Sequence, residues 1–161
     1  MVGEPERRHR LIEEVAAVYD WLDSQSRQNP GRAGRCNVCG ACCDFQAYDH
    51  RLFVTPPELI YLAVKLGVRD FKPMSSGRCP YQENKRCTIH DARFAGCRVF
   101  CCNGDAGFQS ELSEAALRRL KMLCDELQVP YRYQDLATAF GSFATDTCRS
   151  AGAPCPGDRE G

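Results

Sequence analysis

The stretch that decides the fold carries four cysteines in eight residues: Cys36-Asn37-Val38-Cys39-Gly40-Ala41-Cys42-Cys43. A C-x-x-C turn places two thiolates within reach of one metal ion, and here the turn is repeated on itself. Gly40 supplies the backbone freedom that such a tight wrap needs. Because Cys42 and Cys43 are adjacent and point in different directions, the stretch predicts two metal positions or one multinuclear cluster.

A second group of cysteines follows further along the chain and can complete such a centre. It consists of Cys79, Cys87, Cys97 and the adjacent pair Cys101-Cys102, so that the two groups hold nine of the twelve cysteines. Eight thiolates could close two zinc sites of four cysteines each. Four of them could instead hold one iron–sulfur cluster and leave the others for a second metal or for packing. The spacing alone leaves both arrangements open.

The overall charge of the 161-residue chain is balanced, with 21 Lys and Arg against 21 Asp and Glu. This argues against a protein that mainly binds nucleic acid, because phosphate binding needs a net basic surface. The charged residues 1–8 precede no apolar run of signal-peptide type, and no stretch approaches the roughly 18 apolar residues of a membrane helix. We therefore expect a soluble, cytoplasmic protein with no membrane contact. Thiols stay reduced in that compartment, so dense cysteine indicates metal rather than disulfides.

The expected fold class is mostly α with a short β-hairpin, in a small metal-stapled, cysteine-rich α+β domain. Four parts are expected along the chain: an N-terminal amphipathic helix over 1–28, a cysteine-cluster metal-binding domain over 29–104, a C-terminal helical extension over 105–147, and a disordered tail over 148–161. No internal repeat of solenoid spacing is found.

Apolar residues at helical spacing indicate the first helix. They recur every three or four residues, at Leu11, Val15, Val18 and Leu22. Two later helices are expected over about Ser113–Leu127 and about Tyr133–Phe140, and a short strand over 48–54.

Between the two cysteine groups, capping residues predict another helix. Thr55 caps its start, Pro56 takes the first helical position, and Glu58 closes a capping box. Gly67 is placed to end it.

The second cysteine group begins with a predicted β-hairpin over residues 79–89, whose turn is formed by Glu83-Asn84-Lys85. A hairpin of this kind brings its two cysteines to one end of the ladder. Asp91 is then expected to cap a single helical turn that delivers Cys97.

The full cysteine pattern is C-x-x-C-G-x-C-C, followed by C-P-Y…C-x-I and then by C-R-x-F-x-C. It resembles the CxxCxxCC family, the YkgJ-like cysteine cluster proteins, which are described as zinc- or iron-chelating domains. The match spans about Cys36 to Cys102 and includes residues 54–59 and 66–68, which look like the family's linking helix. The first helix and the helices after Asn103 lie outside it.

The resemblance implies a ligand set of eight cysteines. These are Cys36, Cys39, Cys42, Cys43, Cys79, Cys87, Cys97 and Cys102. The family usually ends its motif with Pro-Cys, so Cys101 stands where a proline is expected; either member of the pair can be the ligand, and Cys102 is favoured. His90 stands where the family typically has Tyr, and Phe94 where it has Pro in an Arg-Pro pair. These departures leave the thiols intact.

Other candidate side chains have simpler interpretations. Cys124 lies on the apolar face of a helix and is expected to pack in the core. Cys148 and Cys155 belong to a weakly structured end and are expected to be spectators. His90 has the C-x-x-H spacing of a zinc ligand, but a hydrogen-bonded turn histidine is favoured because eight thiols suffice. Arg98, inside the motif, is expected to offset the negative charge of the thiolates.

The leading hypothesis is a metal-binding protein that chelates zinc or iron, an iron–sulfur cluster included, with metal binding coupled to folding. One alternative is an iron–sulfur oxidoreductase or a methyl-transfer accessory enzyme, since a related cysteine domain occurs in the flagellin lysine methylase. Another is a zinc-stapled interaction module that binds a protein partner through the helix at Ser113–Leu127. No catalytic residue is assigned, because no Ser-His-Asp grouping, phosphate-cradling loop or dinucleotide fingerprint can be picked out.

Overall fold

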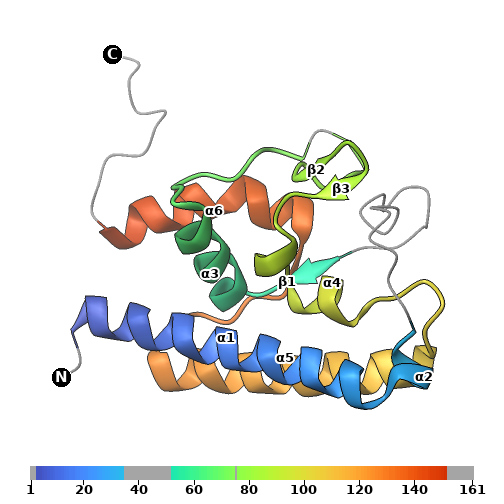
Figure 1. Ribbon diagram of the computed structural model, residues 1–161. Coiled ribbons are helices and arrows are strands. Elements are labelled where there is room, and N and C mark those ends of the chain that lie inside the picture. Colours follow the sequence, from blue (N-terminus) through green and yellow to red (C-terminus); the bar gives the residue numbers. More distant parts are fainter. Residues whose placement is uncertain (1–2, 35–51, 75, 152–161) are drawn as a thin grey trace.

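The computed structural model describes residues 3–34, 52–74 and 76–151, without the side chains of 144–151. A long pair of helices forms one side of the molecule and the other elements pack against it (Figure 1). The elements in chain order are α1 (Glu4–Gln28), α2 (Pro30–Ala33), β1 (Phe53–Val54), α3 (Pro56–Leu66), β2 (Gln82–Glu83), β3 (Arg86–Cys87), the 3-10 helix η2 (His90–Ala92), α4 (Ala95–Val99), α5 (Ala106–Leu127), β4 (Gln134–Asp135) and α6 (Leu136–Ala151). The predicted class, mostly α with a short β-hairpin, is confirmed.

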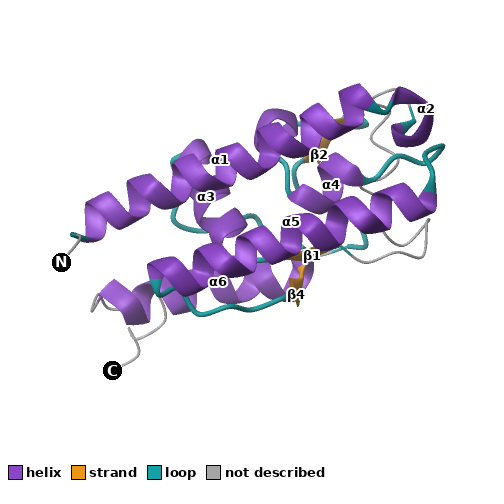
Figure 2. Ribbon diagram, turned by 90° about the horizontal axis from the view of Figure 1, so that it is seen from below, coloured by secondary structure: helices purple, strands orange, loops and turns teal. Residues whose placement is uncertain are grey.

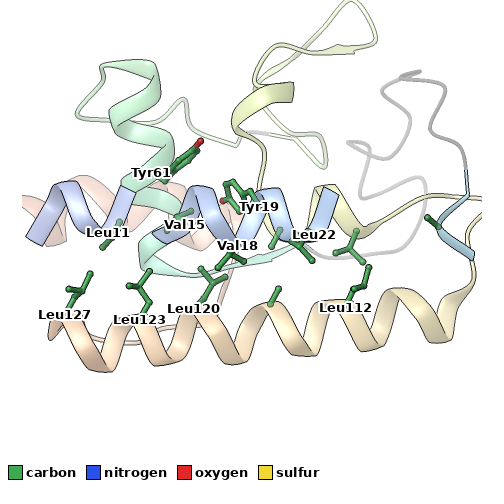
Figure 3. Close-up of a cluster of buried hydrophobic side chains, with 14 of the residues drawn as sticks. Leu11, Val15, Val18, Tyr19, Leu22, Tyr61, Leu112, Leu120, Leu123 and Leu127 are labelled. Carbon is green, nitrogen blue, oxygen red and sulfur yellow. The ribbon is translucent and has the colours of Figure 1, made fainter. Parts of the chain in front are cut away.

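The long pair consists of α1 and α5, which lie side by side and antiparallel (Figures 1 and 2). The apolar stripe expected on the first helix is buried against α5, because α5 presents its own leucines at helical spacing (Figure 3). We call this cluster the first core; its buried residues are Leu11, Val15, Val18, Tyr19, Leu22, Ala33, Tyr61, Ala95, Val99, Phe108, Leu112, Ala116, Leu120, Leu123 and Leu127.

A second core joins α3, α6 and the hairpin segment. Its buried residues are Leu52, Val54, Leu59, Leu62, Ala63, Phe71, Cys79, Tyr81, Ile89, Phe94, Leu136, Ala139 and Phe140. Phe140 of α6 joins its parts, with ring centroids 4.8 Å from Phe71 and 5.8 Å from Tyr81. Stacked and edge-on rings at such distances add to the free energy gained by burial.

Two small antiparallel ladders complete the fold. In the hairpin, Gln82 pairs with Cys87, and its turn uses Asn84 and Lys85 at positive φ. In the other ladder, Phe53 of β1 pairs with Asp135 of β4. The hairpin was expected from the sequence; the pairing of β1 with β4 was not.

Three predicted boundaries differ in the structure. The helix expected from Ser113 begins at Ala106, because Asp105 caps it by accepting a hydrogen bond from Phe108 N at 2.7 Å. The helix that carries Cys97 begins after Phe94, so that Asp91 is not its cap. The last helix, expected to end near residue 140, extends into the part expected to be a disordered tail.

Within the described ranges, no helix is both long enough and apolar enough to cross a membrane.

Candidate metal centre

Three of the motif cysteines lie at the second core and come from three different elements. Cys79 is buried within that core directly before the hairpin, and its carbonyl accepts a hydrogen bond from Gln82 N at 3.1 Å. Cys87 of β3 and Cys97 of α4 are half-buried and pack against the same core. The fold therefore gathers this part of the second cysteine group around one apolar cluster.

The first cysteine group, Cys36, Cys39, Cys42 and Cys43, lies outside the described residues. Among the residues that are described, no three His, Cys, Asp or Glu side chains form a group that could hold a metal ion. The predicted convergence of the two cysteine groups therefore stays a prediction. Gly34 and Leu52, the described residues on either side of this group, show where its two flanks lie.

Gly34, which precedes the first cysteine group, lies beside the second cysteine group. Gly34 packs so closely there that a Cβ atom on it would lie 2.4 Å from Asn103 Oδ1 and 3.0 Å from Cys101 Sγ. Gly104 makes an equally close approach, because a Cβ atom on it would lie 2.7 Å from the carbonyl oxygen of Ala33. The segment that leads into the first cysteine group is thus held against the loop that follows α4.

Leu52, which follows the first cysteine group, lies beside α4. Leu52 lies over Gly96, where a Cβ atom would be 2.5 Å from Leu52 Cδ1. Glycine at this position therefore allows Leu52 to pack on the backbone of α4, one residue before Cys97. Both flanks of residues 35–51 consequently contact the segment that carries the end of the second cysteine group.

Gly34 adopts φ 76° and ψ −178°, a backbone conformation that is essentially restricted to glycine. We expect Gly34→Ala to lower the free energy of unfolding by about 1–3 kcal/mol, since the backbone is strained and the methyl group meets Asn103 and Cys101. Urea unfolding measures the change. Gly31→Ala is the matched control, because a Cβ atom on Gly31 meets nothing within 4 Å. Equal stability of the two variants would contradict the close packing at Gly34.

The two adjacent cysteines after α4 have different surroundings. The Cys101 thiol is half-buried and donates a hydrogen bond to Asn103 Oδ1. The Cys102 side chain is exposed. Cys101 therefore already has a partner next to Gly34, while Cys102 has none among the described groups.

Glu58 of α3 fixes the N-terminus of α4. Its Oε1 accepts a hydrogen bond from Ala95 N at 2.8 Å, and its Oε2 accepts bonds from Thr55 N and Thr55 Oγ1, both at 2.9 Å. The side chain is 1% exposed. Burial raises the pKa of the Glu58 carboxyl, and the hydrogen bonds from Ala95 and Thr55 oppose the shift. One buried carboxyl thus caps α3 and positions α4.

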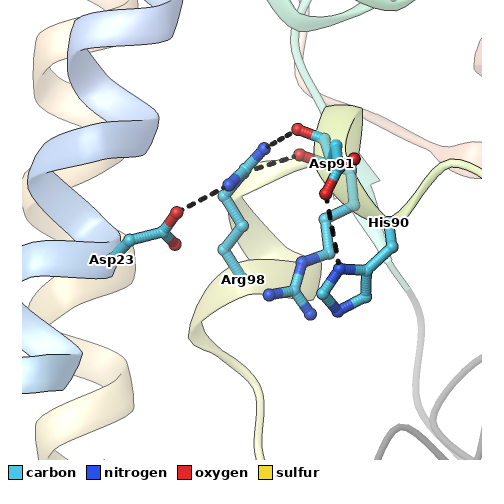
Figure 4. A network of polar contacts seen from close by, with 5 residues as sticks. Asp23, His90, Asp91 and Arg98 are labelled. Carbon is cyan, nitrogen blue, oxygen red and sulfur yellow. Dashed lines mark hydrogen bonds and ion pairs between the residues drawn. The ribbon is translucent and has the colours of Figure 1, made fainter.

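Arg98 fixes α4 to α1 (Figure 4). Its guanidinium donates to Asp23 Oδ2 at 2.9 Å, to the Arg93 carbonyl at 3.0 Å and to the Asp91 carbonyl at 2.6 Å. It also lies over the ring of Tyr19, 4.2 Å from the centroid, and only 7% of the side chain is exposed. Among the described residues the counter-charge of Arg98 is therefore Asp23, a partner that the sequence did not indicate. Its expected role toward the thiolates stays a prediction.

His90 and Cys124 occupy the places expected of them. His90 opens η2 as a turn residue, and partial burial together with the nearby Arg93 lowers its pKa. Cys124 is buried in α5, where burial raises the pKa of its thiol to about 11. It remains a protonated core residue at neutral pH.

Sequence reasoning missed two residues that hold this region together. Tyr19 and Asp23 lie on α1, outside both cysteine groups. By its spacing, Tyr19 looks like any residue of the apolar stripe, and Asp23 looks like any residue of the solvated face. The capping box did identify Glu58, although not its second bond, to α4. Only tertiary structure brings these side chains to the segment that bears Cys97.

Comparisons with protein-family models, with curated proteins and with solved structures find no match for this chain. The family resemblance therefore rests on the cysteine pattern and on residues 54–59 and 66–68.

Proposed function

We propose that the protein is a cytoplasmic metal-binding protein that chelates zinc or iron, an iron–sulfur cluster included. The proposed ligands are Cys36, Cys39, Cys42, Cys43, Cys79, Cys87, Cys97 and Cys102. The observation that carries the proposal is the anchoring of both flanks of the first cysteine group against the segment of α4 and the loop after it.

Chain length turns this anchoring into an argument for a shared centre. Cys36 follows Gly34 by two residues, a span of at most about 7 Å of extended chain. Gly34 itself packs on Cys101 Sγ. This chain length would let Cys36 reach the end of the second cysteine group, which supports a centre shared by the two groups. The reducing interior of the cell would keep the thiols available as ligands.

The rigid placement of α4 supports the same proposal. A helix of five residues has little stability of its own. Here Glu58 accepts a hydrogen bond from the first amide of α4, and Arg98 links α4 to Asp23 of α1. Such supports hold a ligand-bearing segment in one orientation, as the partners around metal ligands commonly do.

Metal analysis of protein purified without air tests the proposal. We expect at least one zinc or iron per chain, and loss of most of that metal in Cys97→Ser. Cys124→Ala is the matched control and should keep its metal, because Cys124 is buried in α5, outside both cysteine groups. Brown protein with broad absorption near about 400 nm identifies an iron–sulfur cluster, and colourless protein with stoichiometric zinc identifies a structural site. Metal-free wild-type protein would contradict the proposal.

The same measurement distinguishes the adjacent cysteines. We expect Cys102→Ser to lower the metal content and Cys101→Ser to retain it, because the Cys101 thiol is hydrogen-bonded to Asn103. The opposite result would assign the ligand to Cys101 and leave the centre itself in place.

A further inference from the structure

A polar pocket lies between α1, α3 and the segment that joins η2 to α4. Its volume is about 220 Å³. α1 contributes Tyr19, Asp20 and Asp23, while Tyr61 comes from α3 and Arg93 from the segment before α4. Lining by polar and charged groups distinguishes it from a packing defect, which would be apolar.

Two buried donors of this pocket have no hydrogen-bond partner. They are the Tyr19 hydroxyl and Arg93 Nε, the only such side-chain atoms in the described part of the chain. Tyr19 is 2% exposed. Its hydroxyl is near enough to Glu58 to lower the pKa of that carboxyl, but it makes no hydrogen bond of normal geometry. Buried donors without partners are costly, so they indicate a missing acceptor.

One of the two guanidinium groups that line the pocket has no carboxylate partner among the described residues. Arg98 is neutralised by Asp23 at 2.9 Å. Arg93 makes no ion pair with any described residue. Partial burial and the charges of Arg93 and Arg98 lower the pKa of His90, which also lines the pocket. Burial raises the pKa of the Tyr19 hydroxyl, which therefore stays a neutral donor.

The two other acids of the pocket, Asp20 and Asp91, do not prevent the binding of an anion. Asp20 and Asp91 are both exposed, so water solvates their carboxylates and screens their charges. These two acids therefore face solvent, and the third, Asp23, is paired with Arg98.

We propose that this pocket binds a small oxyanion, a phosphate or carboxylate group, through the guanidinium of Arg93 and the hydroxyl of Tyr19. An oxyanion would accept hydrogen bonds from both donors and balance the charge of Arg93. The volume admits one such group with little attached to it. None of the proposed cysteine ligands lines this pocket, although Cys97 lies close enough to Tyr19 to affect the pKa of its hydroxyl.

Calorimetric titration of the full chain, as purified with its metal, tests the proposal. Inorganic phosphate and malonate are added in separate experiments, at ionic strength held constant with sodium chloride. We expect saturable binding of at least one of them at one site per chain, and the stronger of the two identifies the oxyanion class. Arg93→Gln should weaken binding by about tenfold or more, and Tyr19→Phe by about three- to tenfold. Arg69→Gln is the matched control, since Arg69 is exposed and is not part of the lining, and should bind as the wild type does.

A second readout needs no variant. The Arg93 Nε–H signal in a nitrogen–proton correlation spectrum should shift on addition of the anion, whereas that of Arg69 should not. Absence of saturable binding of both anions up to about 10 mM, or binding by Arg93→Gln equal to that of the wild type, would overturn the proposal. Metal content, measured on the same samples, reports separately on the cysteine centre.

Discussion

Removal of the metal with a strong chelator should unfold the region around the second core and leave the α1–α5 pair helical. The two cores differ in their dependence on the cysteines. The second core contains Cys79 and packs against Cys87 and Cys97. The first core contains no cysteine and is formed mainly by apolar residues of the two long helices. The binding free energy of a structural zinc site, about 10–16 kcal/mol, is also folding free energy for the part that depends on it.

Amide hydrogen exchange resolves the two regions. We expect loss of protection in α3, the hairpin and α4 after chelation, and retained protection in the central turns of α1 and α5. Addition of the metal in stoichiometric amount should restore the protection. Exchange that is unchanged after complete metal removal would show that metal binding and folding are not coupled.

The second large effect is expected at Glu58. Glu58→Ala removes the acceptor of three hydrogen bonds and leaves the Ala95 and Thr55 donors buried without partners. We expect a loss of about 3–5 kcal/mol in the free energy of unfolding, because each unsatisfied buried donor costs about 1–3 kcal/mol and a cavity adds to this. Urea unfolding measures it. Glu111→Ala is the matched control on an exposed helix face and should change stability by less than about 0.5 kcal/mol.

Glu58 also predicts a specific pH dependence. Burial raises its pKa in the folded protein above the ordinary value of 4.5. Between these two pKa values the folded state holds a proton that the unfolded state has lost, so the contribution of Glu58 to stability is full below pH 4.5 and is lost as the pH rises through the folded pKa. The difference in stability between wild type and Glu58→Gln should therefore fall with rising pH across that window. A difference that rises with pH would mean that the hydrogen bonds outweigh burial.

The sequence predicted those elements whose signals are local. The capping box at Thr55 and Glu58 and the glycine at 67 placed α3 between the bounds that the structure shows, since both ends are set by residues within one helical turn. The start of α5 was missed because Asn103-Gly104-Asp105-Ala106-Gly107 has the composition of a loop. Burial of Phe108 and capping by Asp105 extend the helix through it.

Long-range features could not be predicted from the sequence. The pairing of β1 with β4 joins residues about 80 positions apart, and each strand has only two residues. Tyr19 lies on the stripe that predicts a core residue, and only the tertiary approach of Arg93 and Arg98 makes it part of a pocket lining. For the proposed cysteine centre, the eight thiols come from the sequence alone, and the structure adds the contacts that Gly34 and Leu52 make on either side of the first group.

X-ray absorption at the metal edge of anaerobically purified wild-type protein tests the central claim most directly, because it identifies the atoms bound to the metal. A shell made of sulfur at about 2.3 Å is the predicted result. A shell of only nitrogen and oxygen near about 2.0–2.2 Å, or a folded protein that holds no zinc or iron, would contradict it.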